Sequence, residues 1–370
     1  MGLLDRYLAR EILLPFLAGL LFLTQLLLMT QILARADILL GAGVTAVDIA
    51  AVAATLLPHL LGYVMPVAFL LGAIIGVGRL AEDREVMAIG AAGLSPVRLV
   101  RVPLAIGVVV AAVGLWFSVS VEPAGLREAR LRFNEIIKRN ITAKVRPGTF
   151  FDEIPGYTVF AARVGADGWG DVLISDRSDP TAPVLALAKR GTLEPVGSEE
   201  EMRLVLEQGE VHREDPGGEE YVRATFREAG LTLGVGTALT DRNALSGSTK
   251  ELSQAELATL MVPAEGRTAA QARSYEAAYH RRLAAPLAVL AFALMAVPLA
   301  AMRRGGRAAA IGASIGAVLA QYLLLRGGEV MAQRGVLPAA LALQLPNLVL
   351  VTVGLALCVL LERRGPGVVR

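Results

Sequence analysis

The sequence predicts a polytopic α-helical membrane protein with six transmembrane helices and an all-β domain inserted after the third. Of its 370 residues, 54% are hydrophobic and only 19% are charged, and the mean hydropathy is +0.55. Soluble chains of this length are rarely so apolar. The apolar residues form long runs on both sides of a central polar region, and that region has the short alternating pattern of β-strands.

Six apolar runs reach the roughly 20 residues that a helix needs to cross the hydrocarbon core of a bilayer. They are Ile12–Leu33, Ile49–Val77, Leu99–Val121, Leu283–Met302, Ala308–Leu325 and Pro338–Leu361. Spans one to three therefore lie in residues 1–121, the insert with its helical flanks in 122–279, and spans four to six in 280–370. The first eleven residues, MGLLDRYLARE, predict a short amphipathic entry helix at the cytoplasmic surface. The apolar run after them is about twice as long as a signal-peptide core, so we expect no cleavage.

Arginine residues beside the spans predict the orientation. The side that holds the N-terminus carries Arg6, Arg10, Arg79, Arg84, Arg98, Arg101, Arg303, Arg304, Arg307, Arg363, Arg364 and Arg370. The short loops on the other side carry only Arg35, Arg326 and Arg334. This bias places both termini in the cytoplasm and the insert on the outer side, which in a bacterium means the periplasm. Five arginines beside the insert oppose the bias: Arg127, Arg130, Arg132, Arg281 and Arg282.

The insert predicts an antiparallel sandwich or jelly roll. Its near-alternating runs are YTVFAAR (157–163), DVLISD (171–176), VLALAK (184–189), MRLVLEQ (202–208) and YVRATF (221–226). Clusters of Gly, Pro and Asp separate them, as turns between short strands do. After the strands, Ser253 and Glu256 predict a capping box at the start of a short helix. The alanine-rich residues 267–280 are expected to continue into the fourth span.

A charged stretch, Arg79–Arg98, interrupts the apolar sequence between spans two and three. Glu82, Asp83 and Glu85 would lie in the first turn of a helix, where acidic side chains favour the helix dipole. An apolar stripe at helical spacing follows, and Gly93 predicts a left-handed cap before Pro96 starts the next element. Two interpretations remain open: a wet interfacial turn, or a helix whose small Ala and Gly residues dock a partner protein.

Several functional classes find no support in the sequence. No G-x-x-x-x-G-K-[ST] motif occurs, so the chain has no P-loop of its own. Cys358 stands alone, and three distant histidines show no ligand spacing, so no metal or other cofactor is implied. A net charge of +2 gives no indication of nucleic acid binding. The polar residues within the spans include His59, Gln321 and Glu329, which we interpret as packed or, for Glu329, solvated rather than catalytic.

Three stretches resemble the LptF/LptG (YjgP/YjgQ) family, the permease subunits of the lipopolysaccharide export ABC transporter. They are RYLAREILLP near the start, RLAEDREVMAIGAAGLSPVRL between spans two and three, and HRRLAAPLAVLAFALMAVPLA at span four. An acidic residue followed eight positions later by G-L-S is the most specific of these features. The resemblance extends over the whole chain, including the order of three spans, a periplasmic β-jellyroll and three spans.

The resemblance implies that the chain is a transporter subunit and not an enzyme, and that it serves outer membrane biogenesis. It implies pairing with a paralogous permease subunit, an LptB-type cytoplasmic ATPase dimer, LptC and an LptA-type periplasmic bridge. Residues 82–92 would be the coupling helix, in which Glu85 matches the family's acidic residue that pairs with a base of the ATPase. The implied coupling residues are Glu82, Arg84, Glu85, Gly93, Leu94 and Ser95. The sequence leaves open an F-type, a G-type or a self-pairing subunit.

The family also implies roles for residues at the outer ends of the spans. Basic residues there would contact lipid A phosphates, and the candidates are Arg35, Arg127, Arg130, Arg281 and Arg282. Solvated helix charges, or side chains that snorkel to headgroups, would explain the same arginines. Gly72 and Gly76 are expected to pack within the chain. In span five, Gly312, Gly316 and Ala320 could face the partner subunit at the lateral gate for lipid.

Two other functions remain as alternatives. One is a mechanical ABC permease that acts on periplasmic partners and moves no substrate through itself, although such permeases more often have four spans. The other is a membrane-embedded enzyme, which the absence of a catalytic set in the spans disfavours. Copurification with an ATPase would separate both permease functions from the enzyme. Accumulation of lipopolysaccharide in the inner membrane on depletion would separate the two permeases.

Overall fold

The computed structural model describes residues 2–39, 44–144, 146–154, 157–165, 168–177, 184–196, 201–214, 221–233, 248–262, 267–301 and 306–364. The chain divides into two compact units. The first contains residues 1–29, 56–125 and 249–370, and the second contains residues 30–55 and 126–248. Three long helices run through both units, which are described below one at a time.

Six helical spans long and apolar enough to cross a membrane confirm the predicted fold class. The long helices are α1 (Leu3–Leu33), α3 (Ala46–Glu82), α5 (Arg101–Trp116), α6 (Glu122–Lys144), α10 (Ala269–Ala301), α11 (Gly306–Gln333) and α12 (Ala339–Arg364). The π-helical turn η2 (Phe117–Val121) joins α5 to α6, so the third span is continuous. Shorter elements are α2 (Ala36–Leu39), α4 (Glu85–Ala91), the 3₁₀ turn η1 (Pro96–Val100), α8 (Ser248–Glu251) and α9 (Gln254–Leu260).

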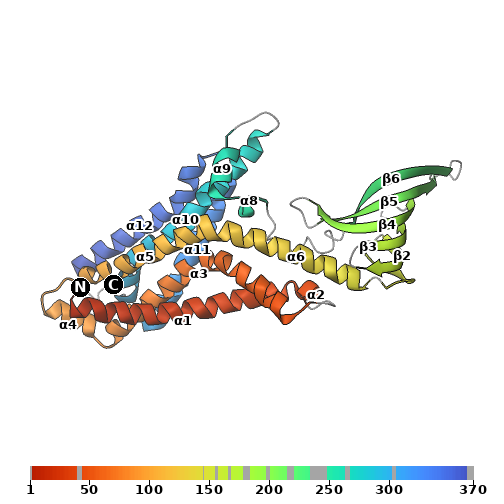
Figure 1. Ribbon diagram of the computed structural model, residues 1–370. Helices are drawn as coiled ribbons and strands as arrows, with labels where there is room; N and C mark the ends of the chain where they lie inside the picture. The colour runs from red at the N-terminus through yellow and green to blue at the C-terminus, as the bar shows by residue number, and fades with distance from the viewer. Residues whose placement is uncertain are drawn as a thin grey trace. The chain divides into compact units, whose positions relative to one another are not determined.

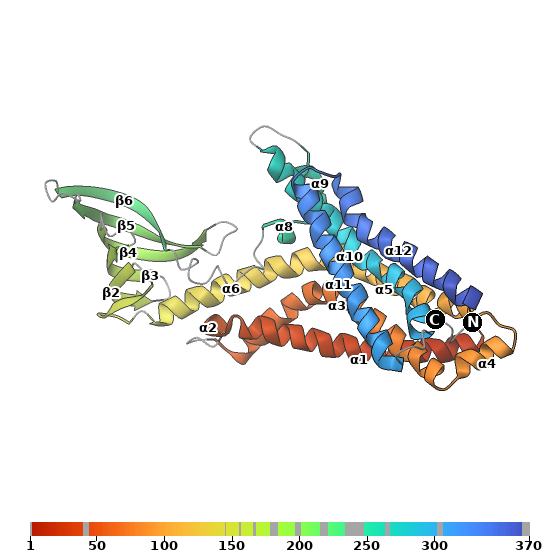
Figure 2. The same ribbon diagram turned by 180° about the vertical axis from the view of Figure 1, so that it is seen from behind.

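The centre of the helical unit lies between α3 and α10. In each of these helices 72% of the most apolar window is buried, against 17–33% in the other four spans. Phe69 and Phe292 are fully buried in a cluster to which α1, α5, α11 and α12 also contribute. Figures 1 and 2 show α10 alongside α11 and α12. The four outer helices therefore leave broad apolar surface for lipid or for another membrane protein.

Helix α1 packs closely on α3 through two glycines. A Cβ at Gly72 would lie 2.6 Å from the Phe16 backbone, and one at Gly76 would lie 2.5 Å from the Glu11 carbonyl oxygen. This confirms that the G-x-x-x-G pair of the second span packs within the chain, because only glycine permits the two backbones to approach so closely.

The short entry helix expected over residues 1–11 is the first part of a longer helix. Helix α1 is unbroken from Leu3 onwards. Leu8 and Ile12 are both 0% exposed, so the apolar face of the span continues into this segment. Arg6 and Arg10 lie on the exposed side of this packed helix.

The second unit contains a six-stranded antiparallel sheet whose strands pair in sequence order. They are β1 (Phe150–Ile154), β2 (Tyr157–Gly165), β3 (Gly168–Asp176), β4 (Val184–Val196), β5 (Glu201–Glu214) and β6 (Tyr221–Leu233). All five predicted strands lie within β2–β6, which confirms the all-β insert. The strands described form one meander, and they show no crossover of the kind that closes a jelly roll. Trp169, Ile174 and Leu204 are buried on one face of the sheet.

The chain re-enters the helical unit through α8 and α9. Ser253 Oγ accepts from the Glu256 amide at 3.1 Å, and a Glu256 carboxylate oxygen accepts from the Ser253 amide at 2.6 Å. The predicted capping box is therefore confirmed. Helix α10 begins at Ala269, which confirms that the alanine-rich segment continues into the fourth span.

Candidate functional site

A tight turn separates α4 from the end of α3. Arg84 has φ 59°, in the left-handed region, and it is the N-cap of α4, two residues after α3 ends. Glu82 is the last residue of α3, and only Glu85 lies in the first turn of α4. The expectation that Glu82 and Asp83 belong to that first turn is therefore wrong. The left-handed backbone of Arg84 changes the direction of the chain after them, so α4 begins only at Glu85.

Helix α4 ends as the sequence predicts. Gly93 has φ +80°, and the Leu94 amide donates to the Ile89 carbonyl at 3.2 Å, which satisfies a carbonyl of the last turn. Pro96 then starts η1, and Ser95 Oγ accepts from the Val97 amide at 3.2 Å. Gly93 is confirmed as the left-handed cap.

Helix α4 is buried at Val86 and open along an adjacent strip of its surface. Val86 is 2% exposed and belongs to an apolar cluster with Leu8, Leu99 and Leu361. Beside this buried contact, a Cβ added to Gly90 or Gly93 would meet nothing within 4 Å. An open groove runs along this side, lined by Met87, Gly90, Ala91, Gly93, Leu94, Ser95, Pro96 and Glu362. A smooth groove on a firmly packed helix suits contact with another protein.

Polar contacts fix the α4 segment to two other helices. Tyr7 of α1 donates its hydroxyl to Glu85 Oε1 at 3.4 Å, and Ser95 donates to the Glu362 carboxylate of α12. Figure 1 shows the start of α1, α4 and the last turns of α12 at the same end of the helical unit. A displacement of α4 would therefore act on several spans at once.

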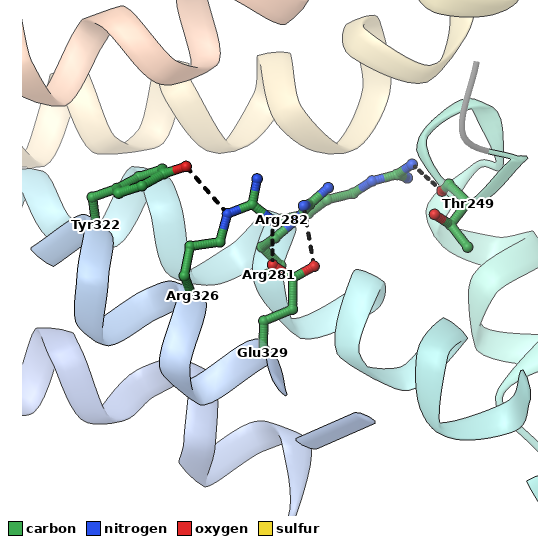
Figure 3. Close-up of polar contacts among 6 residues, drawn as sticks. All are labelled: Thr249, Arg281, Arg282, Tyr322, Arg326 and Glu329. Atoms are coloured by element: carbon green, nitrogen blue, oxygen red, sulfur yellow. Dashed lines mark hydrogen bonds and ion pairs between the residues drawn. The ribbon is translucent and has the colours of Figure 1, made fainter. Parts of the chain in front are cut away.

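A second polar group lies near the far ends of α10 and α11, and we call Arg281, Arg326 and Glu329 the Arg281 cluster. Arg281 Nη1 lies 3.2 Å from Glu329 Oε1, and Arg326 Nη1 lies 2.9 Å from Glu329 Oε2. Figure 3 shows both guanidinium groups on the Glu329 carboxylate and the Tyr322 hydroxyl beside Arg326. The Glu329 side chain is only 12% exposed, so the interpretation of Glu329 as a solvated residue is wrong. Two cations surround it and satisfy its charge.

Arg282 binds backbone carbonyl oxygens, whereas its neighbour Arg281 binds a carboxylate. It is 6% exposed, and its Nη2 donates to the carbonyl oxygens of Thr249 at 3.2 Å and Lys250 at 2.7 Å. Figure 3 shows it extending towards Thr249, away from Glu329. Arg282 thus holds α8 against α10, and its side chain does not snorkel to a headgroup. Burial lowers the pKa of the Lys250 ammonium below its ordinary value, and the nearby Arg281 charge acts in the same direction.

A buried pair that the sequence did not reveal lies beside the Arg281 cluster. His59 Nδ1 is 2.8 Å from Glu122 Oε1, and Ser118 donates to Glu122 Oε2 at 3.3 Å. A small cavity lies between this pair and the cluster, lined by Tyr63, Ser118, Glu122, Arg281, Arg282, Tyr322, Arg326 and Glu329 among others. Ser118 belongs to the π-helical turn η2, a distortion that is frequent at functional sites. Glu122 had no recognisable partner in the sequence because His59 is 63 residues away.

The remaining candidate arginines belong to the second unit. Arg35 is 4% exposed, and its Nη1 donates to the Gln31 carbonyl oxygen at 3.0 Å and to Gln31 Oε1 at 2.6 Å. Its guanidinium also lies 5.5 Å from the centre of the Phe133 ring. On α6, Arg127 is exposed and Arg130 is partly buried. Arg127 is thus more accessible to an external ligand than Arg35.

Span five has an open small-residue face. A Cβ added to Gly312 or Gly316 would meet nothing within 4 Å, and Ala320 is half-buried. The large apolar side chains of Ile315, Leu319 and Leu323 are exposed on the same helix. These glycines therefore pack on nothing within the part of the chain that the structure describes.

The comparison with known families matches the architecture just described. No curated protein sequence matches the chain. A model of the family described as "Lipopolysaccharide export system permease LptF/LptG" matches residues 6–360, which include the insert and nearly all of the six spans. The chain therefore belongs to the LptF/LptG family of lipopolysaccharide export permeases, and it is a multi-pass protein of the inner membrane.

Proposed function

We propose that this chain is a permease subunit of an ABC transporter that extracts lipopolysaccharide from the inner membrane and passes it to a periplasmic bridge. The observation that carries the proposal is the α4 segment. It combines a buried anchor at Val86, an open groove of small residues and the family's acidic position at Glu85. A helix built in this way transmits force from a partner into the spans to which it is fixed.

In this proposal, α4 and both termini lie in the cytoplasm and the sheet lies in the periplasm. The arginine bias supports this orientation. It is also supported by the contacts that bring the start of α1 and the end of α12 to α4, because all three must then face the same compartment.

The partner at α4 would be a cytoplasmic ATPase dimer of the LptB type. Residues 82–92, with Arg84 and the Gly93-Leu94-Ser95 turn, would provide the contact surface. Glu85 is half-buried beside Tyr7, so a base of the ATPase would meet a carboxylate that is already positioned. Charge pairs of this kind gain strength when the interface excludes water.

The substrate would meet cations near the other ends of the spans. Arg127 on α6 is exposed, and Arg281 carries a cationic fork beside a cavity, so these two could reach a lipid phosphate. Arg35, Arg130 and Arg282 are more buried and would contribute charge or position. Lipid passing through the spans would then reach the sheet, which LptC and an LptA-type bridge would extend at an open strand edge.

A second permease subunit would complete the transporter. The open face of α11 supports this part of the proposal, because Gly312 and Gly316 allow another helix to approach closely. In the proposed complex, this face with Ala320 lies at the lateral opening for lipid.

Charge reversal at Glu85 tests the proposed function. Glu85→Arg should abolish lipopolysaccharide export and reduce ATPase copurification, because truncating or reversing one partner of a desolvated pair costs about 2–5 kcal/mol. Export is measured as transfer of labelled lipopolysaccharide from proteoliposomes, and folding as the thermal unfolding midpoint in detergent. Glu207→Arg, which reverses an exposed carboxylate on β5, is the matched control and should leave both unchanged. Normal copurification with full export in Glu85→Arg would refute the assignment.

A further inference from the structure

The first turns of α1 contact the helices around α4 on three sides. Asp5 Oδ1 accepts from Arg101 of α5, from Nε at 3.1 Å and from Nη2 at 2.5 Å. Glu11 lies 3.2 Å from Arg79 of α3, and Tyr7 reaches Glu85 of α4. These contacts join residues that are 68–96 positions apart in the sequence.

The pair of Asp5 and Arg101 is the strongest of these contacts. The Asp5 side chain is 12% exposed, and its second oxygen accepts from the Gly2 amide at 2.9 Å. Both carboxylate oxygens therefore have donors, and one donor is a guanidinium that approaches with two nitrogens. Charge-assisted bonds with this geometry are about twice as strong as neutral ones. Arg101 is the first residue of α5, directly after η1, so the pair holds the end of the α4 segment.

The start of α1 and the α4 segment are also packed together through apolar side chains. Leu8 and Ile12 are fully buried in the cluster that contains Val86 and Leu99. Gly76 places the backbone of α3 directly against Glu11 of α1. Side chains packed at this density do not yield independently, so α4 cannot shift without moving the start of α1.

We propose that residues 3–12, which we call the N-terminal brace, are a second part of the coupling machinery and convey displacement of α4 to α1 and α5. Asp5 and Arg101 are its positioning residues, and Tyr7 connects the brace to Glu85. The inference rests on the proposed function, because it needs a partner that displaces α4. It adds that the force enters the first and third spans through the brace as well as through the chain on either side of α4.

Neutral variants and a charge exchange test the N-terminal brace in the assembled, reconstituted transporter. Asp5→Asn and Arg101→Gln should keep the ATPase bound and hydrolysing ATP, but lower the lipopolysaccharide transferred per ATP hydrolysed about tenfold. A tenfold loss corresponds to about 1.4 kcal/mol, which is the size expected for one charge-assisted bond. The exchange of both residues, Asp5→Arg with Arg101→Asp, should restore most of the transfer per ATP.

The ratio of transfer to hydrolysis distinguishes coupling from folding, because a misfolded subunit lowers assembly and both rates together. Asp171→Asn is the matched control, since Asp171 pairs with Arg163 at 2.9 Å on the sheet and should not change the ratio. The inference is wrong if the neutral variants keep the wild-type ratio, if they lose the ATPase altogether, or if the exchanged pair assembles without recovery. A wild-type chain that binds no ATPase would instead overturn the proposed function itself.

Discussion

At the scale of single residues, two largely buried carboxylates of the helical unit, Glu122 and Glu329, have partners that compensate for their burial. His59 and Glu122 are both less than one-tenth exposed, and each is the other's partner. Burying one without the other would leave a polar group with no compensation for its lost hydration. The same rule explains why Glu329 takes both Arg281 and Arg326.

This pairing leads to a prediction about His59 and Glu122. Glu122→Leu or His59→Leu alone should destabilise the protein by about 1–3 kcal/mol, because the remaining partner is buried and unsatisfied. The double variant should be more stable than the sum of the two single losses, since neither member of the pair is left buried without the other. Thermal unfolding in detergent measures the difference, and strict additivity would contradict the prediction.

The sheet contains a pair with a predicted pH dependence. Arg223, and next to it His212, hold the pKa of the Glu210 carboxyl below its ordinary value of 4.5. A depressed folded-state pKa means that ionised Glu210 stabilises the sheet above pH 4.5, and that this contribution disappears as the pH falls through the folded value.

We therefore expect the pairing of β5 with β6 to weaken in acid more in the wild type than in Glu210→Gln. Hydrogen exchange of the β6 amides at neutral and at acid pH measures this effect. Glu207→Gln serves as the control because it removes another carboxylate of the same strand. An equal acid response in wild type and Glu210→Gln would show that the pair contributes nothing.

At the scale of elements, two glycine pairs with the same sequence pattern have opposite surroundings. Gly72 and Gly76 lie against α1, whereas Gly312 and Gly316 face open space. The G-x-x-x-G pattern signals close packing, but it does not say whether the partner helix belongs to the same chain.

The contrast gives a matched pair of variants. Gly76→Ala should separate α1 from α3 and cost about 1–3 kcal/mol, because the new Cβ overlaps the Glu11 carbonyl. Gly312→Ala should leave the isolated chain unchanged. Thermal unfolding of the two variants should therefore differ, and equal midpoints would argue against the close packing of α1 on α3.

Local elements were predictable where a single residue dictates the backbone. Gly93 gave the end of α4, and Ser253 with Glu256 gave the start of α9. The start of α4 was missed because Arg84 adopts a left-handed conformation that arginine rarely prefers. The continuity of α1 through the first residues was not expected because the sequence does not show that distant residues bury Leu8 and Ile12.

At the scale of the whole molecule, the six spans were predictable because a bilayer requires every spanning helix to be long and apolar. The order of the strands was not, since alternation shows which face is buried but not which strand lies beside which. The sequence also treated Arg281 and Arg282 alike, because it does not show which distant groups lie beside each side chain. In the structure, Arg281 forms an ion pair with Glu329, whereas Arg282 donates hydrogen bonds to backbone carbonyls of α8.

The two ends of the helical unit have different roles in the proposed function, one in coupling to the ATPase and the other in contact with lipid. At one end, α4 is anchored by Val86 and open along its groove, and the N-terminal brace ties it to the first and third spans. At the other end, cations and a small cavity lie among four helices. Membership of the LptF/LptG family and this division together support an ATP-driven lipid permease.

The most direct test is ATP-dependent transfer of lipopolysaccharide. The chain, purified with the proteins that accompany it in detergent, is reconstituted into vesicles containing labelled lipopolysaccharide, with a soluble periplasmic bridge protein outside. We predict that ATP drives the label onto the bridge protein, and that a non-hydrolysable analogue does not. Hydrolysis of ATP without any transfer of lipopolysaccharide would contradict the account and favour a permease that acts mechanically on periplasmic partners.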